Sequence, residues 1–276
     1  MDTLLITGAQ GFLGCRLARY YARTWKVVAV GHKEMDITSK TSVSQVFETY
    51  QPKVVVHCAA ISNTGYSQEH PDESWQVNVM GSVHVALACK EIGCKLVYMS
   101  SDQVYNGNLE DFLLPESILV QPVSVYGKHK LEAERRVAEI LPDAVGLRLT
   151  WMYDFPDSPL KNTGILLNLK NTYEQGRTLK ASLKEHRAVT YVWEVVKNME
   201  KTFTLSGGVY NYGSENTLTS YETYLQLARH INLPEPEQWI LADKEFRRNL
   251  SMDISKIRGN GILFPDSTEP VQPFSL

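Results

Sequence analysis

The sequence predicts an α/β fold, a doubly wound parallel sheet of the Rossmann type with a smaller, irregular C-terminal substrate lobe. Two observations lead to this prediction. In the first 150 residues, short and continuously apolar runs alternate with amphipathic stretches, as strands buried on both faces alternate with their connecting helices. The first apolar run also stops at a glycine-rich turn. Ligands of such sheets lie beyond the carboxyl ends of the strands.

Each expected element follows from that alternation. Apolar, mostly β-branched residues dominate five runs that have the length of strands. Between these runs, apolar residues recur at the spacing of one helix face. The expected strands are residues 3–7, 26–30, 53–58, 95–100 and 144–149, and the expected helices are residues 12–23, 43–50, 72–92 and 125–141.

The pattern loosens after residue 150, where prolines and aromatic residues interrupt it. The remaining expected elements are helices at 164–175, 190–201 and 220–231 and a strand at 209–212. We therefore expect a dinucleotide-binding domain over residues 1–150, joined again by about residues 185–210. The substrate-binding lobe would then comprise residues 151–184 and 211–276.

Composition excludes several classes of protein. The chain carries 28 Lys and Arg against 31 Asp and Glu, so it has no whole-chain basic footprint for nucleic acid and we expect no polybasic membrane anchor. No apolar run approaches the roughly 20 residues of a membrane span, and the N-terminus lacks the features of a signal peptide. The four cysteines form no CxxC pair. We expect reduced thiols, no metal site and a cytoplasmic monomer or homodimer.

The glycine-rich turn has the spacing TGxxGxxG and lies between the first strand and the first helix, as a dinucleotide-binding loop does. Gly8 would allow the tight turn, and Gly11 would let the backbone approach a pyrophosphate. Gly14 would let the helix pack closely on the strand. The free N–H groups of the helix would then face the phosphates. A purely structural turn is the alternative.

The end of the second strand bears on which dinucleotide binds. An acidic residue there would hold the ribose 2′-hydroxyl of NAD, but the strand runs into Gly31, His32 and Lys33. Lys33 or His32 could pair with a 2′-phosphate instead. The sequence therefore favours NADPH, with NADH possible, although Lys33 could equally be an ordinary solvated lysine.

Tyr126 and Lys130 stand four residues apart in an expected helix and so share one face. A nearby ammonium favours phenolate and would lower the tyrosine pKa from its usual value of about 10. Such a phenol can pass a proton to a carbonyl oxygen as hydride reaches the carbon. The fourth strand ends at Ser100 and Ser101, whose hydroxyls could hydrogen-bond the same oxygen. A solvated helix pair and a turn serine are the alternatives.

Together these residues resemble the extended short-chain dehydrogenase/reductase family. The resembling segments are TGAQGFLG at 7–14, HCAA at 57–60, NVMG at 78–81, SSDQVY at 100–105 and PVSVYGKHK at 122–130. Within the family, the chain is most similar to the dTDP-4-dehydrorhamnose reductase branch. The segments that resemble this branch are SSDQVYNG at 100–107, LRLTWMY at 147–153 and RRNLSMDISKI at 247–257.

The resemblance implies a role for each matching position. The implied catalytic residues are Ser101, Tyr126 and Lys130. The implied cofactor contacts are the backbone of Gly11, Phe12 and Leu13 around the pyrophosphate, Asp36 and Ile37 beside the adenine, Ala59 and Ala60 at a strand end, and again Tyr126 and Lys130. The implied substrate contacts are Ser101, Asp102 and Trp151. Alternatives are a turn aspartate for Asp36, a packing aromatic for Trp151, and a backbone-satisfied amide for Asn78, which matches an ordering asparagine.

The function that the resemblance implies is reduction of a nucleotide-linked 4-keto-deoxysugar, as in dTDP-rhamnose biosynthesis, with hydride from NADPH and the proton from Tyr126. Two segments depart from the branch. Residues 184–190, KEHRAVT, replace a DQxGxPT-like pattern, and Arg247-Arg248 replaces an Arg-Pro pair. The identity of the sugar and nucleotide therefore stays open. The alternatives are a nucleotide-sugar epimerase or dehydratase, and a non-catalytic NADP-binding regulatory subunit, because the beta subunit of methionine adenosyltransferase also resembles this branch.

Overall fold

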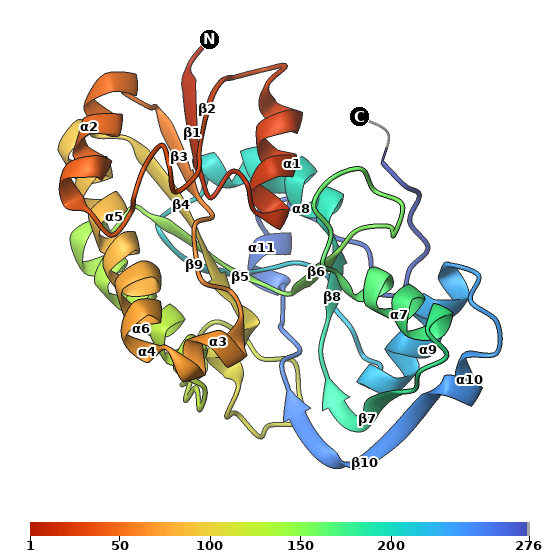
Figure 1. Ribbon diagram of the computed structural model, residues 1–276. Helices are drawn as coiled ribbons and strands as arrows, with labels where there is room; N and C mark the ends of the chain where they lie inside the picture. Colours follow the sequence, from red (N-terminus) through yellow and green to blue (C-terminus); the bar gives the residue numbers. More distant parts are fainter. Residues whose placement is uncertain (275–276) are drawn as a thin grey trace.

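A computed structural model describes residues 1–274, with a six-stranded parallel sheet at its centre (Figure 1). The strand order is β2-β1-β3-β4-β5-β9. The strands are β1 (Thr3–Thr7), β2 (Lys26–Val30), β3 (Val54–His57), β4 (Lys95–Ser101), β5 (Val145–Leu149) and β9 (Gly208–Tyr212). The predicted Rossmann-type α/β fold is confirmed. Because the chain runs from β1 outward to β2 and returns to pair β3 on the other side of β1, the strand order reverses beside β1, where such folds bind ligands.

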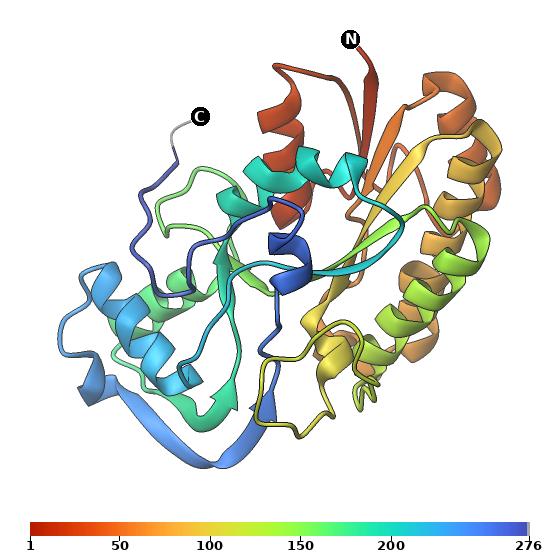
Figure 2. The ribbon, with the colours of Figure 1, turned by 180° about the vertical axis from the view of Figure 1, so that it is seen from behind.

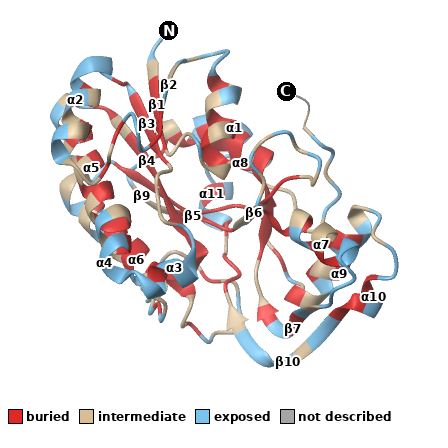
Figure 3. Cartoon of the chain, in the orientation of Figure 1, coloured by how far each residue is buried: buried red, intermediate tan, exposed pale blue. Residues whose placement is uncertain are grey.

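Helices cover both faces of this sheet because its strands are apolar on both sides. Leu4 and Ile6 of β1 join one core cluster with Leu17, whereas Leu5 joins a second cluster with Phe47 and Ala86. Figure 3 shows buried strands between helices whose outer faces are exposed. The helices that flank the sheet are α1 (Phe12–Tyr21), α2 (Lys40–Tyr50), α5 (Gly81–Ile92), α6 (Val125–Ile140) and α8 (Val192–Asn198).

The expected long helix at 72–92 is interrupted. It consists of α4 (Pro71–Trp75), a π-helical turn η1 (Gln76–Met80) and α5. The expected helix at 190–201 also differs, because it begins as strand β8 (Val189–Tyr191), continues as α8 and ends in the 3₁₀ helix η3 (Met199–Thr204). In both places helical apolar spacing concealed a local change of hydrogen-bonding pattern.

The C-terminal part contains two small parallel sheets, which the sequence did not predict. Strand β6 (Trp151–Tyr153) pairs with β8, and β7 (Leu179–His186) pairs with β10 (Ile240–Asn249). Figure 2 shows β10 at the outer edge of the molecule, with the loop that follows residue 105 extending toward it. The other elements are α3 (Thr64–Glu69), the 3₁₀ helix η2 (Asp102–Tyr105), α7 (Ile165–Glu174), α9 (Ser220–His230), α10 (Pro236–Trp239) and α11 (Ser255–Arg258). The division into two lobes stays a prediction.

Candidate active site

The glycine loop connects β1 to α1 and packs against the end of β3. Gly8 has a φ of +64°, and a Cβ there would lie 2.7 Å from the backbone nitrogen of Ala59. A Cβ on Gly14 would lie 2.3 Å from the carbonyl oxygen of Gly8. The N–H of Gly11 donates to that same oxygen at 2.8 Å. Glycine is therefore required sterically at positions 8 and 14, and the start of α1, with Phe12 and Leu13 in its first turn, is fixed at the strand-order reversal.

The end of β2 lies against this loop, because a Cβ on Gly31 would be 2.8 Å from the Gln10 side chain. Lys33 is exposed in the following turn. Sequence reasoning missed Glu34, whose carboxylate folds back to accept the Gly31 N–H at 2.8 Å. The end of β2, which was expected to lack an acidic residue, therefore carries Glu34. The sequence could have indicated this, because residues three apart in a turn lie close together.

Asp36 and Ile37 follow the turn at the end of β2. The Asp36 carboxylate accepts the N–H and the hydroxyl of Thr38 at 2.9 and 2.7 Å. Asp36 thus forms an Asx turn, and these hydrogen bonds lower the pKa of its carboxyl group. Ile37 is buried, its carbonyl contacts His84 Nδ1 at 2.9 Å, and its side chain lies where a Cβ on Gly81 would be.

A buried polar network supports the end of β3. His57 Nδ1 lies 2.7 Å from the hydroxyl of Thr7, and that hydroxyl accepts the N–H of Ala59 at 3.1 Å. Burial lowers the pKa of His57 to about 3, so the ring is neutral at physiological pH. Asn78 in the π turn forms two hydrogen bonds of 3.0 Å with the backbone of Ile61. Asn78 is thus a buried amide satisfied by backbone, and it fixes the chain directly after Ala59 and Ala60.

Ser101, Tyr126 and Lys130 converge at the carboxyl end of β4, all less than a tenth exposed. The ammonium of Lys130 is 5.7 Å from the centre of the Tyr126 ring and donates to the carbonyl of Met99 at 2.9 Å. Its charge also acts on Cys58 and His57, at the end of β3. Ala59, which follows Cys58, packs against Gly8. The cluster of Ser101, Tyr126 and Lys130 therefore lies near the glycine loop.

The protonation of this cluster differs from the sequence expectation. Burial raises the pKa of Tyr126 well above its usual value of 10, and Asp102 adds to the rise, whereas Ser101 and Arg187 oppose it. The expected lowering of the tyrosine pKa by Lys130 is therefore wrong for the protein alone. Burial lowers the pKa of Lys130 to about 8, against the opposing effects of Cys58 and Glu134. The phenol is consequently protonated at neutral pH.

Asp102 and Trp151, the predicted substrate contacts, both contact Arg187, which sequence reasoning missed. Arg187, in the turn between β7 and β8, donates to both carboxylate oxygens of Asp102 at 2.7 and 3.2 Å. Its guanidinium carbon also lies 5.1 Å from the ring centre of Trp151. The sequence could have drawn attention to Arg187, because residues 184–190 depart from the family pattern.

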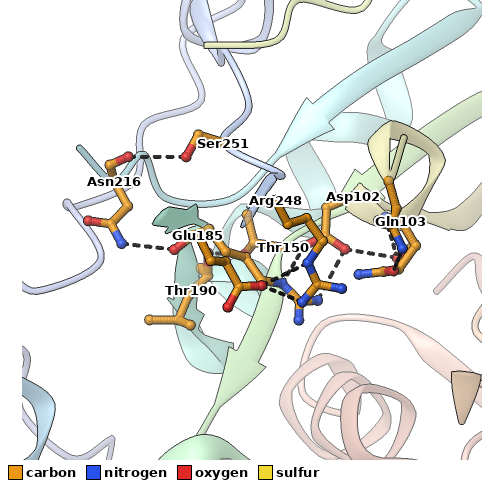
Figure 4. A network of polar contacts seen from close by, with 12 residues as sticks. Asp102, Gln103, Thr150, Glu185, Thr190, Asn216, Arg248 and Ser251 are labelled. Atoms are coloured by element: carbon orange, nitrogen blue, oxygen red, sulfur yellow. Dashed lines mark hydrogen bonds and ion pairs between the residues drawn. The ribbon is translucent and has the colours of Figure 1, made fainter. Parts of the chain in front are cut away.

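A cavity of about 350 Å³ opens beside this cluster, between the loop after η2 and strands β7 and β10. Cationic side chains, Lys184, Arg247 and Arg248, contribute to its wall. Arg248 forms an ion pair with Glu185, and Figure 4 places Asp102, Glu185 and Arg248 in one polar network. Another wall residue, Asn216, donates to the carbonyl of Arg187 at 2.8 Å, so the cavity adjoins the Asp102 region.

Residues 1–274 lack two further kinds of feature. None of the helices there combines the length and the apolar character that crossing a membrane requires. Within the same range, His, Cys, Asp and Glu side chains do not gather in threes as metal ligands would.

Comparisons with known proteins agree with this architecture. Residues 1–246 match the family described as RmlD substrate binding domain. The spore coat polysaccharide biosynthesis protein SpsK of Bacillus subtilis (strain 168) is 28% identical over 223 residues, 80% of this chain and 77% of that protein. Methionine adenosyltransferase 2 subunit beta of Bos taurus is 26% identical over 278 residues, 94% of this chain and 82% of that protein.

A solved structure extends the likeness to the fold. The dTDP-4-dehydrorhamnose reductase of Bacillus anthracis str. Ames, described as in complex with NADP, matches with a TM-score of 0.87 at 22% identity. The match covers 98% of this chain and 95% of that one. With a family match that spans most of its length, the chain belongs to the RmlD substrate binding domain family.

Proposed function

We propose that this protein is an NADPH-dependent oxidoreductase that reduces the 4-keto group of a nucleotide-linked deoxysugar, as dTDP-4-dehydrorhamnose reductases do. One observation carries the proposal: Ser101, Tyr126 and Lys130 are buried together at the ligand-binding edge of the sheet, beside the glycine loop. The family match supports it, as does the NADP complex of the Bacillus anthracis reductase, which has the same fold.

The residues at the strand-order reversal fit a dinucleotide. Gly11 keeps a side chain out of the space in front of α1, and the first-turn N–H groups of a helix have no intrahelical acceptors. Those of Phe12 and Leu13 would therefore bind the pyrophosphate. Lys33 would pair with a 2′-phosphate, and Ile37 and Ala59 would flank the bound cofactor. The cofactor supplies the hydride.

The chain's own side chains would handle the proton. Tyr126, protonated at neutral pH, would donate its proton to the carbonyl oxygen of the substrate. The Ser101 hydroxyl would donate a hydrogen bond to the same oxygen and stabilise the charge that develops there. Lys130, with a pKa of about 8, retains much of its charge at neutral pH and would orient the nicotinamide ribose.

The nucleotide end of the substrate would lie in the cavity between the loop after η2 and the paired strands β7 and β10. Lys184, Arg247 and Arg248 would attract phosphate oxygens there, and Trp151 would pack against the sugar. Arg248 stands where the branch has proline, so this chain brings a second guanidinium to the cavity wall.

The direct test is a turnover assay of the purified chain with NADPH and dTDP-4-dehydrorhamnose, alongside other nucleotide-linked 4-keto sugars. We expect one NADPH oxidised for each keto sugar reduced, measured by NADPH absorbance and by mass spectrometry of the sugar. Tyr126→Phe should bind NADPH normally but lower kcat by about 10²- to 10⁴-fold. Near-normal turnover by Tyr126→Phe would remove Tyr126 as the proton donor.

The same preparation separates the alternatives. NAD⁺ that copurifies and is not consumed, with a sugar inverted at one carbon, would identify an epimerase. A partner protein that copurifies in stoichiometric amount, with no turnover of any keto sugar, would identify a regulatory subunit such as the likeness to methionine adenosyltransferase 2 subunit beta suggests. Either result would replace the reductase assignment.

A further inference from the structure

The ion pair between Arg187 and Asp102 joins the turn between β7 and β8 to the end of the strand that carries Ser101. The Asp102 side chain is 1% exposed, so water cannot stabilise its charge, and the bidentate contact with Arg187 provides the main compensation. The Arg187 side chain is itself 18% exposed, so the pair is mostly shielded from water.

Arg187 is held in place by contacts on other sides. Asn216 donates to its carbonyl oxygen at 2.8 Å, and its guanidinium lies over the Trp151 ring at 5.1 Å. These contacts fix both the backbone and the side chain, so the position of its charge beside Asp102 is set by the fold.

Asp102 connects this charge to the reacting groups. The hydroxyl of Ser101 donates to Asp102 Oδ1 at 3.1 Å, and this oxygen also accepts from Arg187 Nη2. The oxygen of Ser101 accepts the Gln103 N–H at 3.2 Å, so the direction of the Ser101 hydroxyl is defined at both ends. A carboxylate that shares its charge with a guanidinium is a weaker acceptor than an unpaired one. Ser101 can then redirect its proton to a substrate oxygen at lower cost.

We propose that Arg187 is a positioning residue for keto-sugar reduction, which neutralises Asp102 so that Ser101 can turn to the substrate and Tyr126 can release its proton. The proposal rests on the reductase function above. Against the branch pattern DQxGxPT, the segment KEHRAVT places Arg187 where the pattern has glycine. Glycine has no side chain that could pair with Asp102, so a chain with glycine at this position would lack the ion pair.

The charged and titratable groups around the pair come from four elements. They are Tyr126 on α6, Glu185 on β7 with its partner Arg248 on β10, and Tyr224 on α9. After burial, Asp102 raises and Arg187 lowers the pKa of Tyr126. Without Arg187, the negative charge of Asp102 would act on the phenol unopposed and hold its proton more strongly.

The test compares Arg187→Met, Asp102→Asn and the double variant with the unmodified protein. Methionine retains a long apolar stem over Trp151 but removes the charge. We expect Arg187→Met to lower kcat by about ten- to a hundredfold while NADPH affinity is unchanged. Its kcat should also fall as pH rises through a new ionisation, because an unpaired buried carboxyl has a raised pKa and suppresses the reaction when it ionises.

The double variant decides between positioning and mere structural support. In it, the amide introduced by Asp102→Asn still accepts a hydrogen bond from Ser101 but carries no charge. We therefore expect kcat to recover at least about tenfold over Arg187→Met and the new pH step to vanish. Arg135→Met is the matched control, since Arg135 forms an exposed ion pair on α6 and should leave kcat and its pH profile unchanged.

Two results would overturn the proposal. One is an Arg187→Met protein with the kcat and pH profile of the unmodified chain. The other is a double variant as slow as Arg187→Met, with the same pH profile. An unmodified protein that reduces no keto sugar would instead refute the proposed function, on which the role of Arg187 depends, so the two failures are distinguishable.

Discussion

The two sides of the candidate active site, the proposed cofactor side and the proposed substrate side, are built in different ways. On the cofactor side, the glycine loop, the end of β3 and the π turn contact one another through backbone and through uncharged groups such as Thr7, neutral His57 and Asn78. On the substrate side, Asp102 pairs with Arg187 and Glu185 pairs with Arg248, so charged side chains from distant segments make the contacts.

This difference explains where the sequence follows the family and where it departs. Backbone packing tolerates almost no change, because a single Cβ would occupy space that neighbouring loop backbone fills. Ion pairs between side chains can be replaced in pairs without altering the fold. We therefore expect substitutions on the cofactor side to act by disrupting packing, and substitutions on the substrate side to act by leaving a charge without its partner.

Gly14→Ala should have the largest effect of the cofactor-side variants. Its Cβ would meet the Gly8 carbonyl oxygen at 2.3 Å, so α1 must shift away from β1. We expect the free energy of unfolding to fall by about 2–4 kcal/mol and NADPH affinity to drop more than about tenfold. Urea unfolding and NADPH titration measure these effects. Gly259→Ala is the control, because a Cβ there makes only ordinary contacts. Equal behaviour of the two variants would contradict the packing argument.

His57→Gln should change how stability depends on pH. The pKa of His57 is about 3 in the folded protein and about 6.5 when unfolded, so between these values the unfolded chain binds the extra proton. Stability from the neutral ring is complete above pH 6.5 and is lost as pH falls, by at most about 1.4 kcal/mol per pH unit.

The glutamine variant cannot bind that proton, so its unfolding free energy should decline less steeply from pH 6.5 to pH 4 than that of the unmodified protein. Chemical denaturation across this range measures the two slopes. Parallel slopes would mean that His57 is accessible to protons in the folded state, and that the cofactor side does not depend on an uncharged ring.

Lys33→Glu should have the smallest effect, since Lys33 is exposed. Loss of one charged contact to a 2′-phosphate should raise the KM for NADPH up to about tenfold and leave the KM for NADH nearly unchanged. Glu34→Gln is the informative partner, because it removes the acid at the same strand end and should favour NADPH further. Equal changes of both KM values in Lys33→Glu would discard this role for Lys33.

The sequence predicted the sheet well because its signals are local. Each strand from β1 to β5 is an apolar run next to a turn, and strand β9 was found by the same criterion. The pair β7 and β10 was missed because both strands are rich in charged residues and show no regular alternation of buried and exposed positions, as in LKASLKEH. Each strand pairs with a partner some sixty residues away in the chain. A polar segment of that kind resembles a loop until its partner is known.

The candidate site divides in the same way. The sequence by itself determined the glycine loop, the helical spacing of Tyr126 and Lys130, and the serine at the end of β4, because spacing along one strand or helix fixes which side chains share a face. Only the tertiary structure decided that Tyr126 is buried with a raised pKa, that Glu34 folds back on Gly31, and that Arg187 neutralises Asp102. Burial and charge pairing depend on segments that meet only when the chain is folded, so no local pattern records them.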